Sequence, residues 1–114
     1  MEPKVGSIIQ RGTSFCDCAV HTGIYVGDGK VVHFDGESSS SGKSDEVREV
    51  SLSEFAEGKD VFVRKEPKDV SHGERVAKRA KEIKNNPNNG YNGNYGLFFG
   101  KHCQDFTADC YNNS

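Results

Sequence analysis

Cys103 has the residue type and sequence position expected of a nucleophile. It follows a Gly-Lys-His stretch and precedes a segment with helical spacing, so we expect it at a helix N-terminus. Unsatisfied N–H groups and the partial positive charge at such a terminus lower the pKa of a thiol, and the thiolate is the reactive form. The alternative is a small buried side chain, because free cysteine is often buried. Cys103 is therefore a candidate nucleophile.

His21 and His33 could supply the base that such a thiol needs. An imidazole can take the thiol proton and later protonate the leaving group, and a second polar group must fix its tautomer. Two histidines on one hairpin, His21 and His33, could fill both roles. The simpler alternative is that each histidine only occupies the polar face of a strand.

The segment 21–34 predicts a β-hairpin, because two apolar runs flank the turn signal Gly-Asp-Gly at 27–29. A two-residue turn would place Ile24 opposite His33 and mix polar and apolar side chains on both faces. A three-residue loop, with Gly29 left-handed and a bulge, separates the faces, which favours it. One face then holds Ile24, Val26, Val32 and Phe34, and the other holds His21, Gly23, Tyr25, Val31 and His33. Both histidines are thus expected on one side, diagonally across two strands.

The remaining pattern predicts an α+β fold, with an antiparallel sheet in a single domain over residues 1–114. Further strands are expected at 5–10, 46–50 and 60–64. A capping box at Ser51–Glu54 opens a short helix that Gly58 closes, and a second capping box is expected at Ser71–Glu74. The helix after it places Val76, Ala80 and Ile83 inward and its basic side chains in solvent. The last helix aligns Cys103, Phe106 and Cys110 on one stripe. His72 is expected at the surface.

Composition excludes several classes of protein. The chain has 114 residues, 33% of them hydrophobic, and a net charge of −2, so it offers no basic surface for nucleic acid. The start of the chain lacks the apolar core of a signal peptide, and no apolar run approaches the ~20 residues of a membrane span. We expect a cytoplasmic protein, with peripheral membrane association as an option, and no cofactor.

Cys16 and Cys18 raise two alternatives. Together with His21 and His33 they could bind zinc, but Cys-x-Cys is tighter than the usual ligand spacing and no second compact pair follows. A disulfide between them is disfavoured, because alternate residues of an extended segment lie about 6.5 Å apart. Without a secretion signal, free thiols are expected. We predict no metal site, and we assign no role to Cys16, Cys18 or Cys110.

Two motifs resemble those of the lecithin:retinol acyltransferase-like family. The first is Gly-Ser-Ile-Ile at 6–9 followed by His-x-Gly-Ile-Tyr-Val-Gly-Asp-Gly-x-Val-Val-His at 21–33. The family typically has Gly-Asp-Leu-Ile and then His-Trp-Ala-Ile-Tyr-Val-Gly-Asp-Gly-x-Val-x-His, its H-box. The second, Tyr-Gly-Leu-Phe-Phe-Gly-Lys-His-Cys-Gln-Asp-Phe at 95–106, is similar to Tyr-x-Leu…Asn-Cys-Glu-His-Phe. The resemblance covers residues 5–111.

The resemblance implies a circularly permuted, NlpC-type papain-like fold and a thiol nucleophile. It assigns Cys103 as nucleophile, His21 as general base and His33 as the orienting partner. Tyr95 resembles a tyrosine before the family's cysteine, although here it lies one residue further upstream. This sequence departs from the family pattern at three places near the triad. His102 replaces an asparagine, Gln104-Asp105 replaces Glu-His, and Thr22-Gly23 replaces Trp-Ala.

The expected activity is acyl transfer through an acyl-Cys103 intermediate, to water or to another acceptor. The resemblance implies a phospholipid ester as donor, and so a phospholipid or membrane surface as partner. Backbone N–H groups at the start of the Cys103 helix could stabilise the oxyanion. Tyr95, His102 and Gln104 are the candidate residues on the substrate and oxyanion side. A cysteine peptidase or amidase with the same triad, or a catalytically silent interaction module, would share these motifs.

Overall fold

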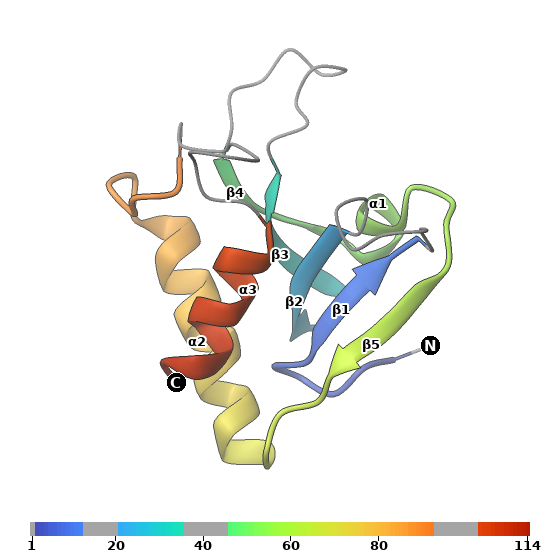
Figure 1. Cartoon of the computed structure of the whole chain (residues 1–114), viewed down its shortest axis with the longest axis horizontal. Coiled ribbons are helices and arrows are strands. Elements are labelled where there is room, and N and C mark those ends of the chain that lie inside the picture. The colour runs from blue at the N-terminus through green and yellow to red at the C-terminus, as the bar shows by residue number, and fades with distance from the viewer. Residues whose placement is uncertain (1, 13–20, 36–45, 93–102) are drawn as a thin grey trace.

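A computed structural model describes residues 2–12, 21–35, 46–92 and 103–114, and it has an α+β architecture (Figure 1). Five antiparallel strands form one sheet in the order β4-β3-β2-β1-β5. The strands are β1 (Ile8–Arg11), β2 (His21–Gly27), β3 (Lys30–Asp35), β4 (Glu46–Ser51) and β5 (Val61–Lys65). The helices are α1 (Leu52–Ala56), α2 (Val70–Asn85) and α3 (Cys103–Asn112). The predicted fold class is confirmed, and the arrangement is compatible with a papain-like α+β fold.

The sheet separates two buried clusters, because side chains alternate between its faces. On one face α2 and α3 pack side by side, which Figure 1 shows beside the strands. Their Val76, Ala77, Ala80, Phe106 and Cys110 join the strand residues Ile24, Val26, Val32 and Phe34. On the other face, α1 contributes Phe55 to a smaller cluster with Ile9, Tyr25 and Val31. The predicted division of the hairpin faces is therefore confirmed.

The turn and the bulge between β2 and β3, which produce this division of the faces, differ from the prediction. Ile24 pairs with Val32, Tyr25 with Val31, and Gly27 with Lys30, so Val26 is an extra residue on β2. The turn itself has two residues, Asp28 and Gly29, at φ of 54° and 70°. Two left-handed residues match the twist of the paired strands. The predicted three-residue loop is wrong, but a bulge one step earlier in the strand produces the same faces.

The capping box of α1 is confirmed in full. The Ser51 hydroxyl accepts from the Glu54 N–H at 3.1 Å, and the Glu54 carboxylate accepts from the Ser51 N–H at 3.2 Å. These hydrogen bonds lower the pKa of Glu54. The left-handed C-cap is Glu57, at φ of 52°, rather than Gly58, although Gly58 also has a positive φ. A fixed N-terminus determines where the helix presents Phe55.

The capping box predicted at Ser71–Glu74 is wrong. The N-cap of α2 is Asp69, whose carboxylate accepts from the His72 N–H at 2.7 Å. Aspartate in an extended conformation caps a helix well, so the helix starts before Ser71 is reached. Ser71 lies in the first turn, where its hydroxyl accepts from Arg75 at 2.7 Å. The inward stripe of α2 is confirmed, because Val76 and Ala80 are buried and Ile83 packs against them.

Two glycines bring α2 against the segment that leads into β1. A Cβ atom on Gly73 would lie 2.2 Å from the Val5 carbonyl oxygen. A Cβ atom on Gly6 would lie 2.4 Å from the Gly73 Cα. Both distances are too short for real atoms, so only two facing glycines allow this approach. The contact fixes the angle at which α2 enters the core.

We expect Gly73→Ala to lower the free energy of unfolding by about 2–3 kcal/mol, because the clash with backbone outweighs the gain in helix propensity. Urea unfolding followed by circular dichroism measures the change. Lys78→Ala, on the exposed face of the same helix, is the control and should change the value by less than about 0.5 kcal/mol. A Gly73→Ala protein as stable as the parent would contradict the close approach.

Candidate active site

His21 and His33 form a buried hydrogen-bonded pair. His21 is the first residue of β2, and His33 lies on the neighbouring strand β3. The distance from His21 Nε2 to His33 Nδ1 is 2.7 Å, and the ring planes meet at 81°. The exposed fractions are 9% for His21 and 4% for His33. The structure thus brings together the two histidines that the hairpin pattern placed on one face.

The proton between the two rings can lie on His21 Nε2 or on His33 Nδ1. Only one of these two tautomers leaves His21 able to act as a base. If His21 carries its proton on Nε2, it donates to His33 Nδ1 and leaves its own Nδ1 free to accept a proton. If His33 carries the proton on Nδ1, His21 accepts it and has no free acceptor nitrogen. The first tautomer is the one that a general base requires.

Phe55 packs against both imidazoles from α1. Its ring centroid lies 5.6 Å from that of His21 and 5.6 Å from that of His33. Gly23 leaves room for it, because a Cβ atom there would approach the Phe55 ring to 3.0 Å and the Val31 side chain to 2.7 Å. Phe55 is fully buried, so the histidine pair has an apolar wall on this side.

Burial is the main influence on the protonation of His21. Loss of water around the ring, the nearby His33 and the nearby Arg11 together lower the pKa of His21 to about 2. Each of these disfavours the charged ring. His21 is therefore a neutral proton acceptor near pH 7.

Cys103 is the first residue of α3 and is 4% exposed. Its helix packs on β2 through the Thr107 and Thr22 hydroxyl oxygens, which are 3.2 Å apart and buried. This contact lies one helical turn after Cys103 and one residue after His21, so the two candidate residues come from directly packed elements. The predicted stripe of Cys103, Phe106 and Cys110 is confirmed, since all three are buried.

Cys110 is the other cysteine in the described part of the chain. Burial, with a smaller effect of the Asp109 carboxylate, raises the pKa of Cys110 to about 12. Its sulfur therefore stays a thiol at physiological pH and serves as a core side chain. Gln104 is half-buried in the first turn of α3, where its carbonyl oxygen accepts from the Thr107 hydroxyl at 3.3 Å. The predicted residues Tyr95, His102, Cys16 and Cys18 lie outside the described residues.

Sequence reasoning missed the polar contacts that anchor α3. Asp109 accepts from the Tyr91 hydroxyl at 2.7 Å, from Arg79 at 2.9 Å and from Asn113 at 2.7 Å. Burial alone would raise the pKa of Asp109, but these donors outweigh it and leave the pKa below its usual value. Tyr91 also packs edge-on against Phe106, so the cluster fixes α3 against the chain that precedes it.

His72, predicted at the surface, is buried in the same region. Its Nδ1 accepts from the Lys68 N–H at 3.0 Å, and its Nε2 lies 3.1 Å from the Tyr111 carbonyl oxygen. The ring therefore joins the start of α2 to the end of α3. No local pattern in the sequence distinguishes such a histidine from an exposed one, because its partners lie on distant elements.

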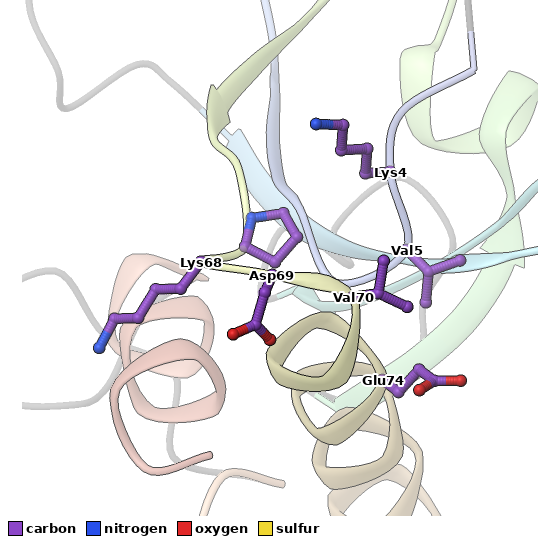
Figure 2. A pocket seen from close by; sticks show the side chains of 7 residues that line it. Lys4, Val5, Lys68, Asp69, Val70 and Glu74 are labelled. Carbon is purple, nitrogen blue, oxygen red and sulfur yellow. The ribbon is translucent and has the colours of Figure 1, made fainter.

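A cavity of about 650 Å³ opens elsewhere, at the start of α2 (Figure 2). Its lining consists of Lys4, Val5, Pro67, Lys68, Asp69, Val70 and Glu74. Figure 2 shows Val5 and Val70 next to each other on its wall, and Val70 is 79% exposed. None of the seven lining residues belongs to the predicted site.

Within the described residues, no three potential ligands gather into a metal-binding cluster. The cysteines of the zinc alternative, Cys16 and Cys18, fall outside those residues. In the same part of the chain, no helix is both long enough and apolar enough to cross a bilayer.

The antiparallel sheet, with a cysteine at the start of a packed helix and two hydrogen-bonded histidines on adjacent strands, is compatible with a papain-like α+β fold. The family model for lecithin retinol acyltransferase matches residues 1–114, so the chain belongs to the LRAT family. Members of this family are generally acyltransferases or hydrolases. A search of curated proteins found no match. The family expected from the two sequence motifs is thereby confirmed.

We expect Asp109→Asn to lower the free energy of unfolding by about 1.5–3 kcal/mol at pH 7, because charged hydrogen bonds become neutral. The folded-state pKa of Asp109 is lowered, so its contribution is present above the unfolded pKa of about 3.9 and is lost as pH falls through the folded value. The difference between variant and parent should therefore shrink below about pH 4.

Urea titrations at several pH values measure this difference. Glu82→Gln, at an exposed position on α2, is the control and should change stability by less than about 0.5 kcal/mol. If the two variants were equally stable at pH 7, the anchoring role of Asp109 would be wrong.

Proposed function

We propose that this protein is a thiol-dependent acyl hydrolase or acyltransferase that forms an acyl-Cys103 intermediate on lipid esters, with phospholipids as donors. The observation that carries the proposal is the buried 2.7 Å hydrogen bond between His21 and His33, on strands against which the Cys103 helix packs. Membership of the LRAT family supports the class of reaction.

In the first step, neutral His21 accepts the Cys103 proton on Nδ1 while the sulfur attacks the ester carbonyl carbon. A carbon–sulfur bond forms, and the carbonyl oxygen becomes an oxyanion. Backbone N–H groups in the first turn of α3, around Gln104, are the proposed donors to this oxyanion. Tyr95 and His102 are proposed on the substrate side of the same site.

In the second step, the oxyanion collapses and the carbon–oxygen bond to the alcohol breaks. Protonated His21 returns its proton to the departing alcohol oxygen, which leaves an acyl thioester on Cys103. Water, or another acceptor, then attacks the thioester while His21 takes its proton. The acyl product leaves and the thiol is regenerated.

The low pKa of His21 favours the return of its proton to the leaving group in the second step. Because the charged ring is disfavoured by burial, the imidazolium formed during attack is a strong acid. It gives its proton readily to the leaving oxygen. His33 accepts from His21 Nε2 throughout and keeps the ring in its orientation.

We expect a soluble short-chain phosphatidylcholine to acylate Cys103, detected as an acyl mass increment on the intact protein and then on the peptide that contains Cys103. His21→Ala should slow acylation by about 100-fold or more, because it removes the base. Cys103→Ala should abolish the increment. Cys110→Ala is the matched control on the same helix and should retain it, since its thiol is not nucleophilic at neutral pH.

Two other results would overturn the proposal. Acylation by an amide or peptide donor, with none by the phospholipid, would indicate the peptidase or amidase alternative. No adduct on Cys103 with any acyl donor, in a protein that circular dichroism shows to be folded, would indicate a silent interaction module.

A further inference from the structure

Arg11 faces the histidine pair from the strand next to His21. In the β1–β2 ladder Arg11 pairs directly with His21, and side chains opposite each other in an antiparallel pair lie on the same face of the sheet. The Arg11 side chain is only 13% exposed. A cation held at this position is therefore a neighbour of the candidate base rather than a solvent-facing charge.

The guanidinium of Arg11 is fixed by the helix that carries Phe55. Its Nη1 donates to the Phe55 carbonyl oxygen at 2.7 Å, and its Nη2 lies 3.5 Å from a carboxylate oxygen of Glu57. Its central carbon lies 5.7 Å from the centroid of the Phe55 ring, over the ring face. Since the same ring packs on both imidazoles, Arg11 joins β1 to the wall of the histidine pair.

The charged and titratable groups around His21 come from several elements. On its own face of the sheet, β3 supplies His33, β1 supplies Arg11, α1 supplies Glu54, and the C-cap of α1 supplies Glu57. Glu54 is held in the capping box of α1, and Glu57 pairs with Arg11.

On the other side, α3 supplies Cys103, Asp105 and Asp109, and Asp109 is held by Arg79. Helix α2 also packs on β2, and a pocket lined by Val26 of β2 is lined from α2 by Glu74, Lys78, Lys81 and Glu82. Within the described part of the chain, His33 and Arg11 are the side chains whose charges disfavour protonation of His21. Of these two, Arg11 keeps its charge at every accessible pH.

Arg11 could in principle bind an anionic group of a substrate or act on the histidines. The first role requires free donors directed at the substrate, whereas the two Arg11 nitrogens described above point to Phe55 and Glu57. The second role requires only proximity to His21 and a fixed position, and both are present. The geometry therefore favours an effect on the histidine pair.

We infer that Arg11 is a positioning residue of this site, which holds Phe55 against both imidazoles and, as a fixed cation on the same face of the sheet, disfavours the charged form of the histidine pair. The inference deepens the proposed function and rests on it for its catalytic meaning, because the imidazolium that Arg11 disfavours is the form that His21 takes after it accepts the thiol proton. Arg11 touches neither the substrate nor the reacting atoms in this scheme.

The first test follows protonation of the His21 ring by NMR between pH 3 and 8, in protein labelled with ¹⁵N. With a pKa of about 2, about one tenth of the His21 rings are protonated at pH 3, and Arg11→Met should raise this fraction to about one half, because the loss of a neighbouring cation raises the pKa by about one unit. Arg11→Lys keeps the charge and should leave the midpoint near that of the parent. Arg64→Met, which removes an exposed arginine of the same sheet, is the matched control.

The same comparison is repeated in a His33→Asn background, which removes the charge of the second ring and so raises the His21 midpoint. If the His21 midpoint in this background were the same with and without Arg11, and both proteins were folded, the inference would be wrong. This measurement needs no activity, so it can fail or succeed independently of the proposed function.

The second test measures the rate at which iodoacetamide alkylates Cys103 at pH 6. If Arg11 disfavours protonated His21, Arg11→Met should favour the thiolate–imidazolium form and raise the rate about tenfold, because one pKa unit is a tenfold change in this equilibrium. A purely structural role would lower the rate instead. An unchanged or lower rate, together with an unchanged His21 midpoint, would leave Arg11 as a structural residue only.

Discussion

The β2 strand carries one more residue than β3 opposes, and the bulge at Val26 absorbs it. Because side chains alternate along a strand, this extra residue determines which of them share a face. With it, the apolar side chains of both strands meet α2 and α3, and the two histidines lie together against Phe55. A pairing shifted by one residue would separate the histidines and expose apolar side chains. The candidate site therefore depends on the same register that forms the core.

Local patterns predicted the features that depend on neighbouring residues. The faces of the hairpin, the capping box of α1 and the buried stripe of α3 all follow from spacings of a few residues. The start of α2 was misplaced because two capping signals, Asp69 and Ser71, lie close together and the earlier one prevails. The contacts of Asp109, His72 and Arg11 could not be predicted. Their partners lie on elements that only the tertiary fold brings near, and no spacing marks them.

Gly23 shows how a departure from the family pattern is accommodated. The resemblance places Thr22-Gly23 where the family has Trp-Ala, so this chain has a smaller residue beside the first histidine. The space that a Cβ atom would fill is occupied in part by the Phe55 ring. Thr22, in place of the tryptophan, contacts Thr107 and joins β2 to α3 through a small polar contact. The Gly23 departure changes how the histidine pair is enclosed, and the Thr22 departure changes how β2 meets α3. The pair itself stays in place.

Cys103 and Cys110 lie on the same stripe of α3, seven positions apart, which is about 10.5 Å along a helix axis. A disulfide needs Cα atoms within about 7 Å, so these two sulfurs cannot be joined while the helix is intact. If an oxidant converted Cys103 to a sulfenic acid, Cys110 could not act as the resolving thiol. Recovery from such oxidation would then depend on a thiol from outside this helix, such as a small-molecule reductant.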